Sequence, residues 1–362
     1  MISKILLKVL TSVIALSVIT AVAAWYHASA MSAVMTSAID TESVSQLSKS
    51  YVQQLGSYEI YDDRALDVLD IQAPITKLAT GYKWLEGPVW SSEGRYLLFS
   101  DIPDHKVYKY DPEEGVSQYL ADSGYSNGLV IQRSTIISER HQQTLLPRLL
   151  LMQSRSRQIA IMDAPLNHPL ANYLVRVSHY QGKRLNSPND GVLNRNGSLF
   201  FTDPPYGLAG QLDDPEKELN FQGVYRLDSD NSLTLLDRSL IYPNGIALTA
   251  DERTLYVAAS NPKKPAWYRY RLNERGDVVH RQLFYQAPIS AVTNHGLPDG
   301  LKVHPSGLVF ATGPKGIWLF DDKGKLLAKV LLPSIAANLA FNDDYSVVYV
   351  TAHQHLLSFR IK

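Results

Sequence analysis

The chain of 362 residues contains no cysteine. This absence excludes disulfide bonds, thiolate metal ligands and a cysteine nucleophile. The 35 Lys and Arg residues balance the 35 Asp and Glu residues, and no long run of one sign occurs. A chain of zero net charge gives no electrostatic reason to expect nucleic acid or another polyanion as a partner. A small neutral or mixed ligand fits this composition better.

Two common catalytic motifs are also missing from the sequence. It has no phosphate-binding P-loop and no G-x-G-x-x-G dinucleotide motif. The stretch Gly124–Gly128 matches G-x-S-x-G, but no helix pattern follows it, as a nucleophile elbow requires. The long amphipathic pattern of a surface helix is absent as well after about residue 75. A hydrolase built from this chain would therefore rely on something other than a serine or cysteine nucleophile.

The N-terminus has the pattern of an export signal. Lys4 and Lys8 precede the apolar stretch "VLTSVIALSVITAVAAW", and Ala28 and Ala30 follow it as small residues. The apolar stretch is also near the length of a membrane span, so residues 1–30 are predicted to be a signal peptide or an uncleaved membrane anchor. Either alternative places the globular part in the periplasm, or anchored to the inner membrane and facing the periplasm. Residues 31–70 are polar and predict a tether, followed by one folded domain over residues 71–362.

Short β segments separated by turn residues fill the remaining chain. Six segments recur in phase, and most continue through a turn into a second apolar strand such as "SLFFTD" or "TLYVAA". They open with "LEGPVW", "YSNGLVI", "SPNDGVL", "YPNGIAL", "LPDGLKV" and "AANLAF". Four-stranded units at a spacing of roughly 40 to 60 residues are typical of propeller blades. We therefore predict an all-β fold, a six-bladed β-propeller; a sandwich or jelly roll would show no such recurrence.

Closure of the ring needs one more strand. The segment "ITKLATGY" precedes the first blade and is predicted to supply the outer strand of the last one. Closed blades and a neutral surface are compatible with a monomer, which we expect.

Polar residues at the start of each innermost strand predict a common site. The first strand of a blade lines the central channel, so residues that enter it at equivalent positions point to one axis. These residues are Glu86, Asn127, Asn189 with Asp190, Asn244, Asp299 and Asn338. Carboxylate and amide oxygens suit a hard divalent cation, and zinc is possible with fewer ligands. Any single Asn-Gly or Asp-Gly is more often an ordinary turn, and Asn127 and Asn338 are expected to be structural.

The ordered motifs of the chain also resemble a known family. They are "EGPVW", "LLFSDIP", "YSNGL", "GKRLNSPNDGV", "FTDPPYGL", "GVYRLD", "PNGIALTADERTLYVA", "LPDGLKV" and "ATGPKGI". Together they resemble the gluconolactonase family, which includes senescence marker protein (regucalcin) and luciferin-regenerating enzyme. The resemblance implies a six-bladed propeller that binds one divalent cation and hydrolyses lactones of sugar acids. Ca²⁺ is the first expectation for the cation, with Zn²⁺, Mn²⁺ or Mg²⁺ as alternatives.

Matched motif by motif, the resemblance places metal ligands at Glu86, Asn244 and Asp299. It places a substrate-binding residue at Asn189, with Asp190 beside it, and Asp299 is also the candidate base for the attacking water. Two stretches depart from the family pattern: "QSRSRQ" replaces a different run in the second blade, and Ser187 stands where animal relatives have arginine.

The predicted function is therefore a metal-dependent lactonase in which a metal-bound water attacks the lactone carbonyl. Asn189 and Asp299 are its predicted catalytic residues. One alternative is a non-catalytic propeller that binds a metal or a small ligand in the cell envelope. Another is a propeller hydrolase that acts on other esters.

Overall fold

The computed structural model describes residues 52–362, except for 138–142 and 292–294. The predicted signal or anchor, and the tether up to residue 51, lie outside the described residues and stay predictions. The described residues form strands and four short 3₁₀ helices, with no α-helix among them. No helix in this part of the chain is long and apolar enough to span a membrane.

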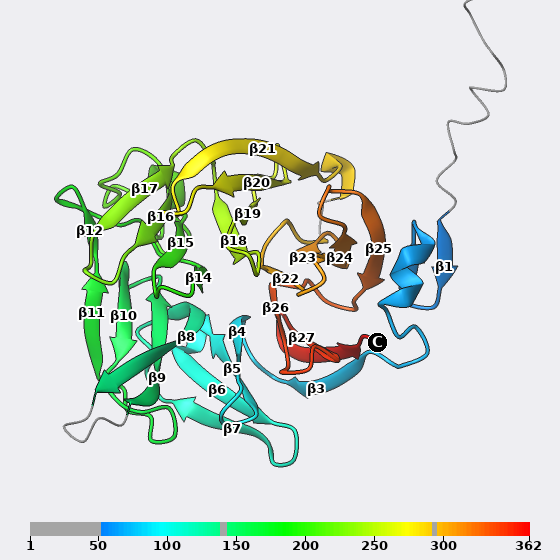
Figure 1. Ribbon diagram of the computed structural model, residues 1–362, viewed down its shortest axis with the longest axis horizontal. Helices are drawn as coiled ribbons and strands as arrows, with labels where there is room; N and C mark the ends of the chain where they lie inside the picture. The colour runs from blue at the N-terminus through cyan, green and yellow to red at the C-terminus, as the bar shows by residue number, and fades with distance from the viewer. Residues whose placement is uncertain (1–51, 138–142, 292–294) are drawn as a thin grey trace, which may run out of the picture. The chain divides into compact units, whose positions relative to one another are not determined.

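Six antiparallel sheets, five with four strands and one with six, surround a central channel, so the predicted six-bladed β-propeller is confirmed (Figure 1). Five blades run in chain order from the innermost strand outward. Blade 1 contains β4 (Leu85–Ser91), β5 (Tyr96–Asp101), β6 (Lys106–Asp111) and β7 (Gly115–Leu120). Blade 2 contains β8 (Ser126–Ile137), β9 (Gln143–Gln153), β10 (Gln158–Met162) and β11 (Tyr173–Val177). Blade 3 contains β14 (Gly191–Leu193), β15 (Leu199–Asp203), β16 (Gly223–Leu227) and β17 (Leu233–Asp237).

The second half of the chain continues the same pattern. Blade 4 contains β18 (Pro243–Leu248), β19 (Thr254–Ala259), β20 (Ala266–Leu272) and β21 (Val278–Gln286). Blade 5 contains β22 (Leu301–Val303), β23 (Val309–Gly313), β24 (Gly316–Phe320) and β25 (Leu326–Leu331). Blade 6 contains β26 (Asn338–Phe341), β27 (Val347–Ala352) and β28 (His355–Arg360). A small hairpin of β12 (His179–Tyr180) and β13 (Lys183–Arg184) precedes blade 3.

The ring closes as the sequence predicts. Strand β3 (Thr76–Thr80) comes from the "ITKLATGY" segment and pairs antiparallel with β28 as the outer strand of blade 6, with Leu356 opposite Ala79. Closure joins the start of the propeller to its C-terminal strand, and β3 covers the outer edge of β28.

Residues 52–70, which the sequence assigns to the tether, form structure of their own. Strands β1 (Gln53–Leu55) and β2 (Tyr58–Ile60) add two strands to the outside of blade 5, where Tyr58 pairs with Val330. The 3₁₀ helix η1 (Asp63–Asp67) follows. The side chains of Tyr58, Ile60 and Leu69 are buried in the cluster between blades 5 and 6. Burial of these three apolar residues explains why so polar a segment is folded against the propeller.

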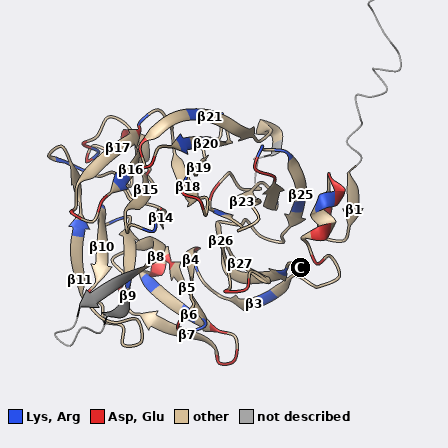
Figure 2. Cartoon of the chain, in the orientation of Figure 1, with Lys and Arg blue, Asp and Glu red and all other residues tan. Residues whose placement is uncertain are grey.

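Apolar clusters fill the space between neighbouring blades and hold the inner strands in place. The largest fully buried side chains are Trp267, Trp318, Tyr225, Tyr256, Tyr270 and Phe99. Trp267 and Trp318 pack across the junction of blades 4 and 5, with ring centroids 5.5 Å apart. Basic and acidic residues are scattered over the blades (Figure 2), in keeping with the zero net charge.

Three further 3₁₀ helices lie in loops. They are η2 (Ile102–Asp104), η3 (Gln211–Asp213) and η4 (Ile289–Ala291). Helix η2 connects β5 to β6, and η3 lies in the long loop between β15 and β16.

Candidate metal and active site

The polar residues predicted to enter the innermost strands occupy equivalent positions in the blades. Glu86, Asn127 and Asn244 are second in their strands and Asn338 is first, whereas Asn189, Asp190 and Asp299 lie just before theirs. Six of them are at most 6% exposed: Glu86, Asn127, Asn189, Asp190, Asn244 and Asn338. Side chains this polar are buried at low cost only where they find partners or a ligand.

Neighbouring blades meet at the backbone of these residues. Gly128 N donates to the Asn189 carbonyl oxygen at 2.7 Å, and the Thr202 hydroxyl donates to the Asn244 carbonyl oxygen at 2.6 Å. A Cβ on Gly245 would clash with the backbone of Asp299 and Gly300 in the next blade. Glycines follow Glu86, Asn127, Asn244 and Asp299. At each of these glycines a Cβ would clash with the backbone of the next blade, so the glycine lets that blade approach closely.

Glu86 is buried and Asp299 is partly buried, and their carboxyl groups influence each other. Burial raises the pKa of Glu86 to about 7, and the negative charge of Asp190 adds to this rise, whereas the Gly87 amide, Asn338 and Lys302 lower it. Burial also raises the pKa of Asp299 well above its usual value, and the charges of Glu86 and Asp190 raise it further. Both groups would hold a proton more tightly than exposed carboxyls unless a cation replaced it.

The oxygen atoms gathered here fit a hard divalent cation. Asn244 donates from Nδ2 to the Ser260 hydroxyl at 2.9 Å, which leaves its buried Oδ1 without a hydrogen-bond partner. Among the described residues, no group of three His, Cys, Asp or Glu side chains is arranged to hold a metal. The predicted set contains only two carboxylates, and its third member is this amide oxygen. Two carboxylates and one unpartnered amide oxygen match the ligand preference of Ca²⁺ and similar ions.

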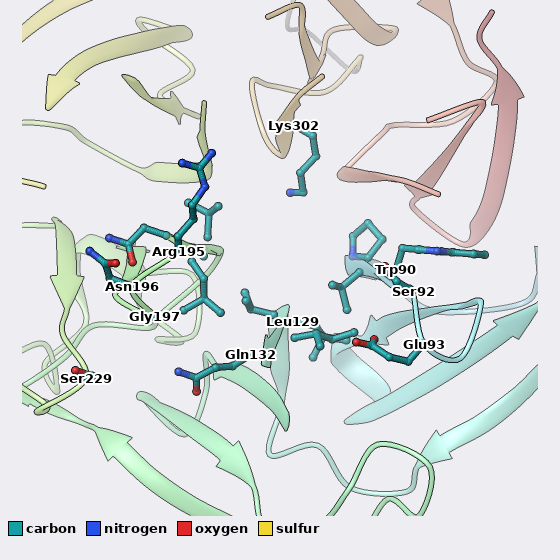
Figure 3. Close-up of a pocket in the computed structure, with 18 residues that line it drawn as sticks. Trp90, Ser92, Glu93, Leu129, Gln132, Arg195, Asn196, Gly197, Ser229 and Lys302 are labelled. Carbon is teal, nitrogen blue, oxygen red and sulfur yellow. The ribbon is translucent and has the colours of Figure 1, made fainter. Parts of the chain in front are cut away.

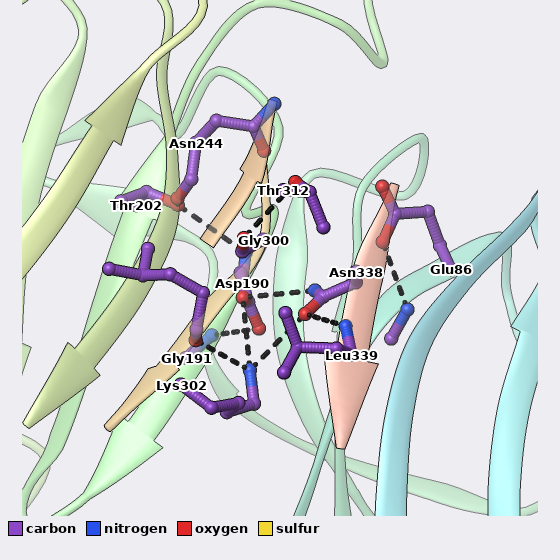
Figure 4. A network of polar contacts seen from close by, with 12 residues as sticks. Glu86, Asp190, Gly191, Thr202, Asn244, Gly300, Lys302, Thr312, Asn338 and Leu339 are labelled. Atoms are coloured by element: carbon purple, nitrogen blue, oxygen red, sulfur yellow. Dashed lines mark hydrogen bonds and ion pairs between the residues drawn. The ribbon is translucent and has the colours of Figure 1, made fainter. Parts of the chain in front are cut away.

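Asp190 lies in a network that crosses the channel and includes Asn338 and Lys302, which also act on Glu86 (Figure 4). Its Oδ1 accepts from Gly191 N at 2.8 Å, and its Oδ2 accepts from Asn338 Nδ2 at 3.1 Å. The Lys302 ammonium lies 3.7 Å from the same Oδ2 and also donates to Asn338 Oδ1. Lys302 was not predicted, and it supplies the positive charge that compensates this buried carboxylate.

Asp203 is a further buried carboxyl, and it holds the loop before Asn189. Asp203 accepts from Asn186 N at 2.8 Å and from Ser187 N at 2.7 Å, and burial raises its pKa to about 7. The fully buried Ser187 hydroxyl donates to the Pro204 carbonyl oxygen at 2.6 Å and accepts from Gly207 N. Ser187 therefore ties the "LNSPND" loop to the "TDPPYGL" loop.

Aromatic pairs line the side of the propeller where the inner strands begin. Tyr242 lies two residues before Asn244 and stacks on Tyr206 of the "TDPPYGL" loop, with centroids 5.5 Å apart and planes 13° apart. Tyr125 lies two residues before Asn127 and has Arg155 of the "QSRSRQ" turn over its ring at 5.0 Å. The "TDPPYGL" loop and the "QSRSRQ" turn thus both flank the predicted site.

The cavity of about 930 Å³ lies farther along the channel (Figure 3). It is lined by the later residues of β4 and β8, by the turn after β14 and by Lys302. None of the three predicted ligands lines it. The ring residues and the Lys302 network therefore separate this cavity from the predicted site.

Solved structures of known proteins share this fold. A gluconolactonase from Xanthomonas campestris superposes with a TM-score of 0.69 and 29% identity, covering 84% of this chain and 94% of that chain. Regucalcin from Agrobacterium tumefaciens, a calcium-binding protein, superposes with a TM-score of 0.60 and 16% identity, covering 80% and 95%. At that identity the second likeness shows the fold alone.

The sequence comparisons agree with the resemblance found in the motifs. The gluconolactonase of Zymomonas mobilis subsp. mobilis is 32% identical over 325 residues, 85% of this chain and 87% of that protein. Pentonolactonase XacC of Haloferax volcanii is 25% identical, over 74% of this chain and 80% of its own. Residues 84–354 match the model of the SMP-30/gluconolactonase/LRE-like region. The chain therefore belongs to the SMP-30/gluconolactonase/LRE-like family.

Proposed function

We propose that this protein is a metal-dependent lactonase that opens lactones of sugar acids. Its class as a lactonase, a carboxylic ester hydrolase, rests on the family and on the gluconolactonase and pentonolactonase relatives. The observation that carries the metal dependence is the pair of Glu86 and Asp299 beside the unpartnered Oδ1 of Asn244. A divalent cation held by these three residues would polarise the lactone carbonyl and promote deprotonation of water.

We assign to Asp299 the role of accepting the proton of the attacking water. Its ionised carboxylate has oxygen atoms that can accept a proton from the attacking water. The water oxygen bonds to the carbonyl carbon, the ring C–O bond breaks, and the ring oxygen takes up a proton to become a hydroxyl. The product is the open hydroxy acid, and the protein itself forms no covalent bond.

Asn189 is the residue assigned to substrate orientation. Its backbone is fixed between blades, since its N–H donates to the Thr202 carbonyl oxygen at 2.9 Å and its carbonyl oxygen accepts from Gly128. Both carboxylate oxygens of Asp190 have protein partners. We therefore assign the substrate contact to Asn189 and a supporting role to Asp190.

The test is lactone hydrolysis by the purified full chain, followed by acid release on a panel of aldonolactones and simpler lactones. We expect activity that is lost on chelation and regained when Ca²⁺, Zn²⁺, Mn²⁺ or Mg²⁺ is restored. Activity that is unaffected by complete removal of metal would contradict the metal dependence. Bound metal without hydrolysis of any lactone would favour a binding propeller, and hydrolysis of other esters alone would favour an esterase.

We also infer that the propeller works outside the cytoplasm. The inference rests on Lys4, Lys8 and the apolar stretch that ends before Ala28 and Ala30. If residues 1–30 are a signal peptide, the protein from an envelope fraction should begin at Met31. N-terminal sequencing measures this, and an intact Met1 in a cytoplasmic fraction would contradict export.

A further inference from the structure

Tyr206 is a tyrosine beside the predicted metal ligands to which no role has yet been assigned. It follows Pro204 and Pro205 in the loop after β15, and it is 37% exposed. Its hydroxyl lies within electrostatic reach of Asp299 and Glu86, and it interacts with Ser260. Ser260 is the same hydroxyl that accepts from Asn244 Nδ2 and donates to the Pro298 carbonyl oxygen. Tyr206 and Asn244 are thus connected through Ser260, and the other two predicted ligands lie within electrostatic reach of the phenol.

The ring of Tyr206 is held by its stacking partner. Tyr242 stacks almost parallel to it, and the Tyr242 carbonyl oxygen accepts from Ser260 N at 2.9 Å. Tyr242 has a φ of 58°, a left-handed conformation that is rare for a bulky side chain. Backbone strain of this kind persists where the surrounding structure enforces it, and it is concentrated at functional sites.

The loop that carries Tyr206 is fixed from the other side as well. A Cβ on Gly207 would clash with the Ser154 carbonyl oxygen and with the Ser187 side chain. Gly207 N donates to the Ser187 hydroxyl at 2.9 Å. Tyr206 thus lies on a loop anchored to blades 2 and 3, and its ring packs on Tyr242 at the start of blade 4.

The phenol of Tyr206 is a hydrogen-bond donor throughout the ordinary pH range. A phenol has an ordinary pKa of about 10, so it keeps its proton at neutral pH. A protonated phenol cannot serve as a base, but it can donate to an oxygen on which negative charge develops. Donors that are already in place before the reaction contribute most when the site excludes water.

We propose that Tyr206 is a catalytic residue that donates a hydrogen bond from Oη to the lactone oxygen that becomes negatively charged during ring opening. This inference rests on the proposed lactonase function. It assigns a second source of oxyanion stabilisation to this chain, in addition to the cation, and it explains why the "TDPPYGL" loop is so firmly tied to the "LNSPND" loop.

The test compares Tyr206→Phe with Tyr206→Leu in the full chain. Tyr206→Phe keeps the ring and its stacking on Tyr242 and removes only Oη. We expect it to lower kcat about 10- to 100-fold while KM, the affinity for Ca²⁺ and Tm stay near those of the unchanged protein, because the lost contact acts in the transition state. Tyr206→Leu should lower kcat at least as much and also lower Tm. Tyr345→Phe, in the exposed turn after β26, is the matched control and should change nothing.

The outcomes separate this inference from the proposed function. If the unchanged protein hydrolyses lactones and Tyr206→Phe has the same kcat, the catalytic role of Tyr206 is wrong and the lactonase assignment stands. If Tyr206→Phe loses Ca²⁺ affinity or Tm together with activity, the hydroxyl has a structural role and the proposal is overturned. If the unchanged protein binds Ca²⁺ but hydrolyses no lactone, the proposed function fails and this inference fails with it.

Discussion

Replacing Asp299 with asparagine is expected to lower the rate of lactone hydrolysis by about 10²- to 10⁴-fold, the range typical of a lost general base. Asparagine has nearly the same shape and keeps an oxygen that can bind a cation, but it cannot accept the proton of the attacking water. Turnover should therefore fall much more than metal affinity. The measurement is kcat/KM by acid release, together with calorimetric titration of Ca²⁺ into the metal-free variant.

Two further variants make this expectation specific. Asp299→Ala removes the ligand oxygen as well, so metal affinity and turnover should both fall. Asp343→Asn changes an exposed aspartate in the turn between β26 and β27 and should leave both quantities unchanged. An Asp299→Ala variant that keeps both metal affinity and turnover would exclude Asp299 from the site.

The fold could be predicted from the sequence because the blades repeat in phase. The period of the "NG" and "DG" segments indicated six innermost strands, and "ITKLATGY" was the one strand left to close the ring. Strands β1 and β2 carried no such signal. Each has three residues, and their partner β25 lies about 270 residues farther along the chain, beyond the reach of local patterns.

The candidate site was predicted in part, and the reason differs from residue to residue. The side chains of Glu86, Asn244 and Asp299 could be placed near one axis because each enters an inner strand at an equivalent position. The glycines that follow them looked like turn residues, yet Gly245 is required because the backbone of the next blade lies where its Cβ would be. This contact is between blades, so the turn sequence alone does not predict it.

Lys302 and Tyr206 were missed for a similar reason. Lys302 follows a predicted ligand by three residues, but its partners Asp190 and Asn338 come from blades 3 and 6 across the channel. Tyr206 lies in the loop after β15, and its position depends on the stacking with Tyr242 of blade 4. The recurring aromatic residue two positions before a ring residue, as in Tyr125 and Tyr242, was the one available signal.

The metal-free protein is expected to lose stability as the pH rises from about 4.5 to about 7. The pKa of Glu86 is raised from 4.5 to about 7 in the folded chain, so in this window the folded state holds a proton that the unfolded state has released. A state that binds more protons is destabilised by rising pH. With about 1.4 kcal/mol per pH unit, Glu86 alone lowers the free energy of unfolding by about 3 kcal/mol across the window. Asp299 contributes in the same direction, since its pKa is also raised.

A bound divalent cation should remove this loss, because it stabilises the ionised carboxylates that burial otherwise disfavours. The gap in Tm between samples with Ca²⁺ and samples with a chelator should therefore widen as the pH rises through the same window. Glu86→Gln carries no titrating group and should flatten the metal-free profile. Asp203→Asn removes a carboxyl whose pKa is also about 7 but which lies outside the ligand set. It should therefore reduce the pH dependence of Tm equally with Ca²⁺ and with a chelator. Equal pH dependence with and without metal in the unchanged protein would show that Glu86 and Asp299 do not hold the cation.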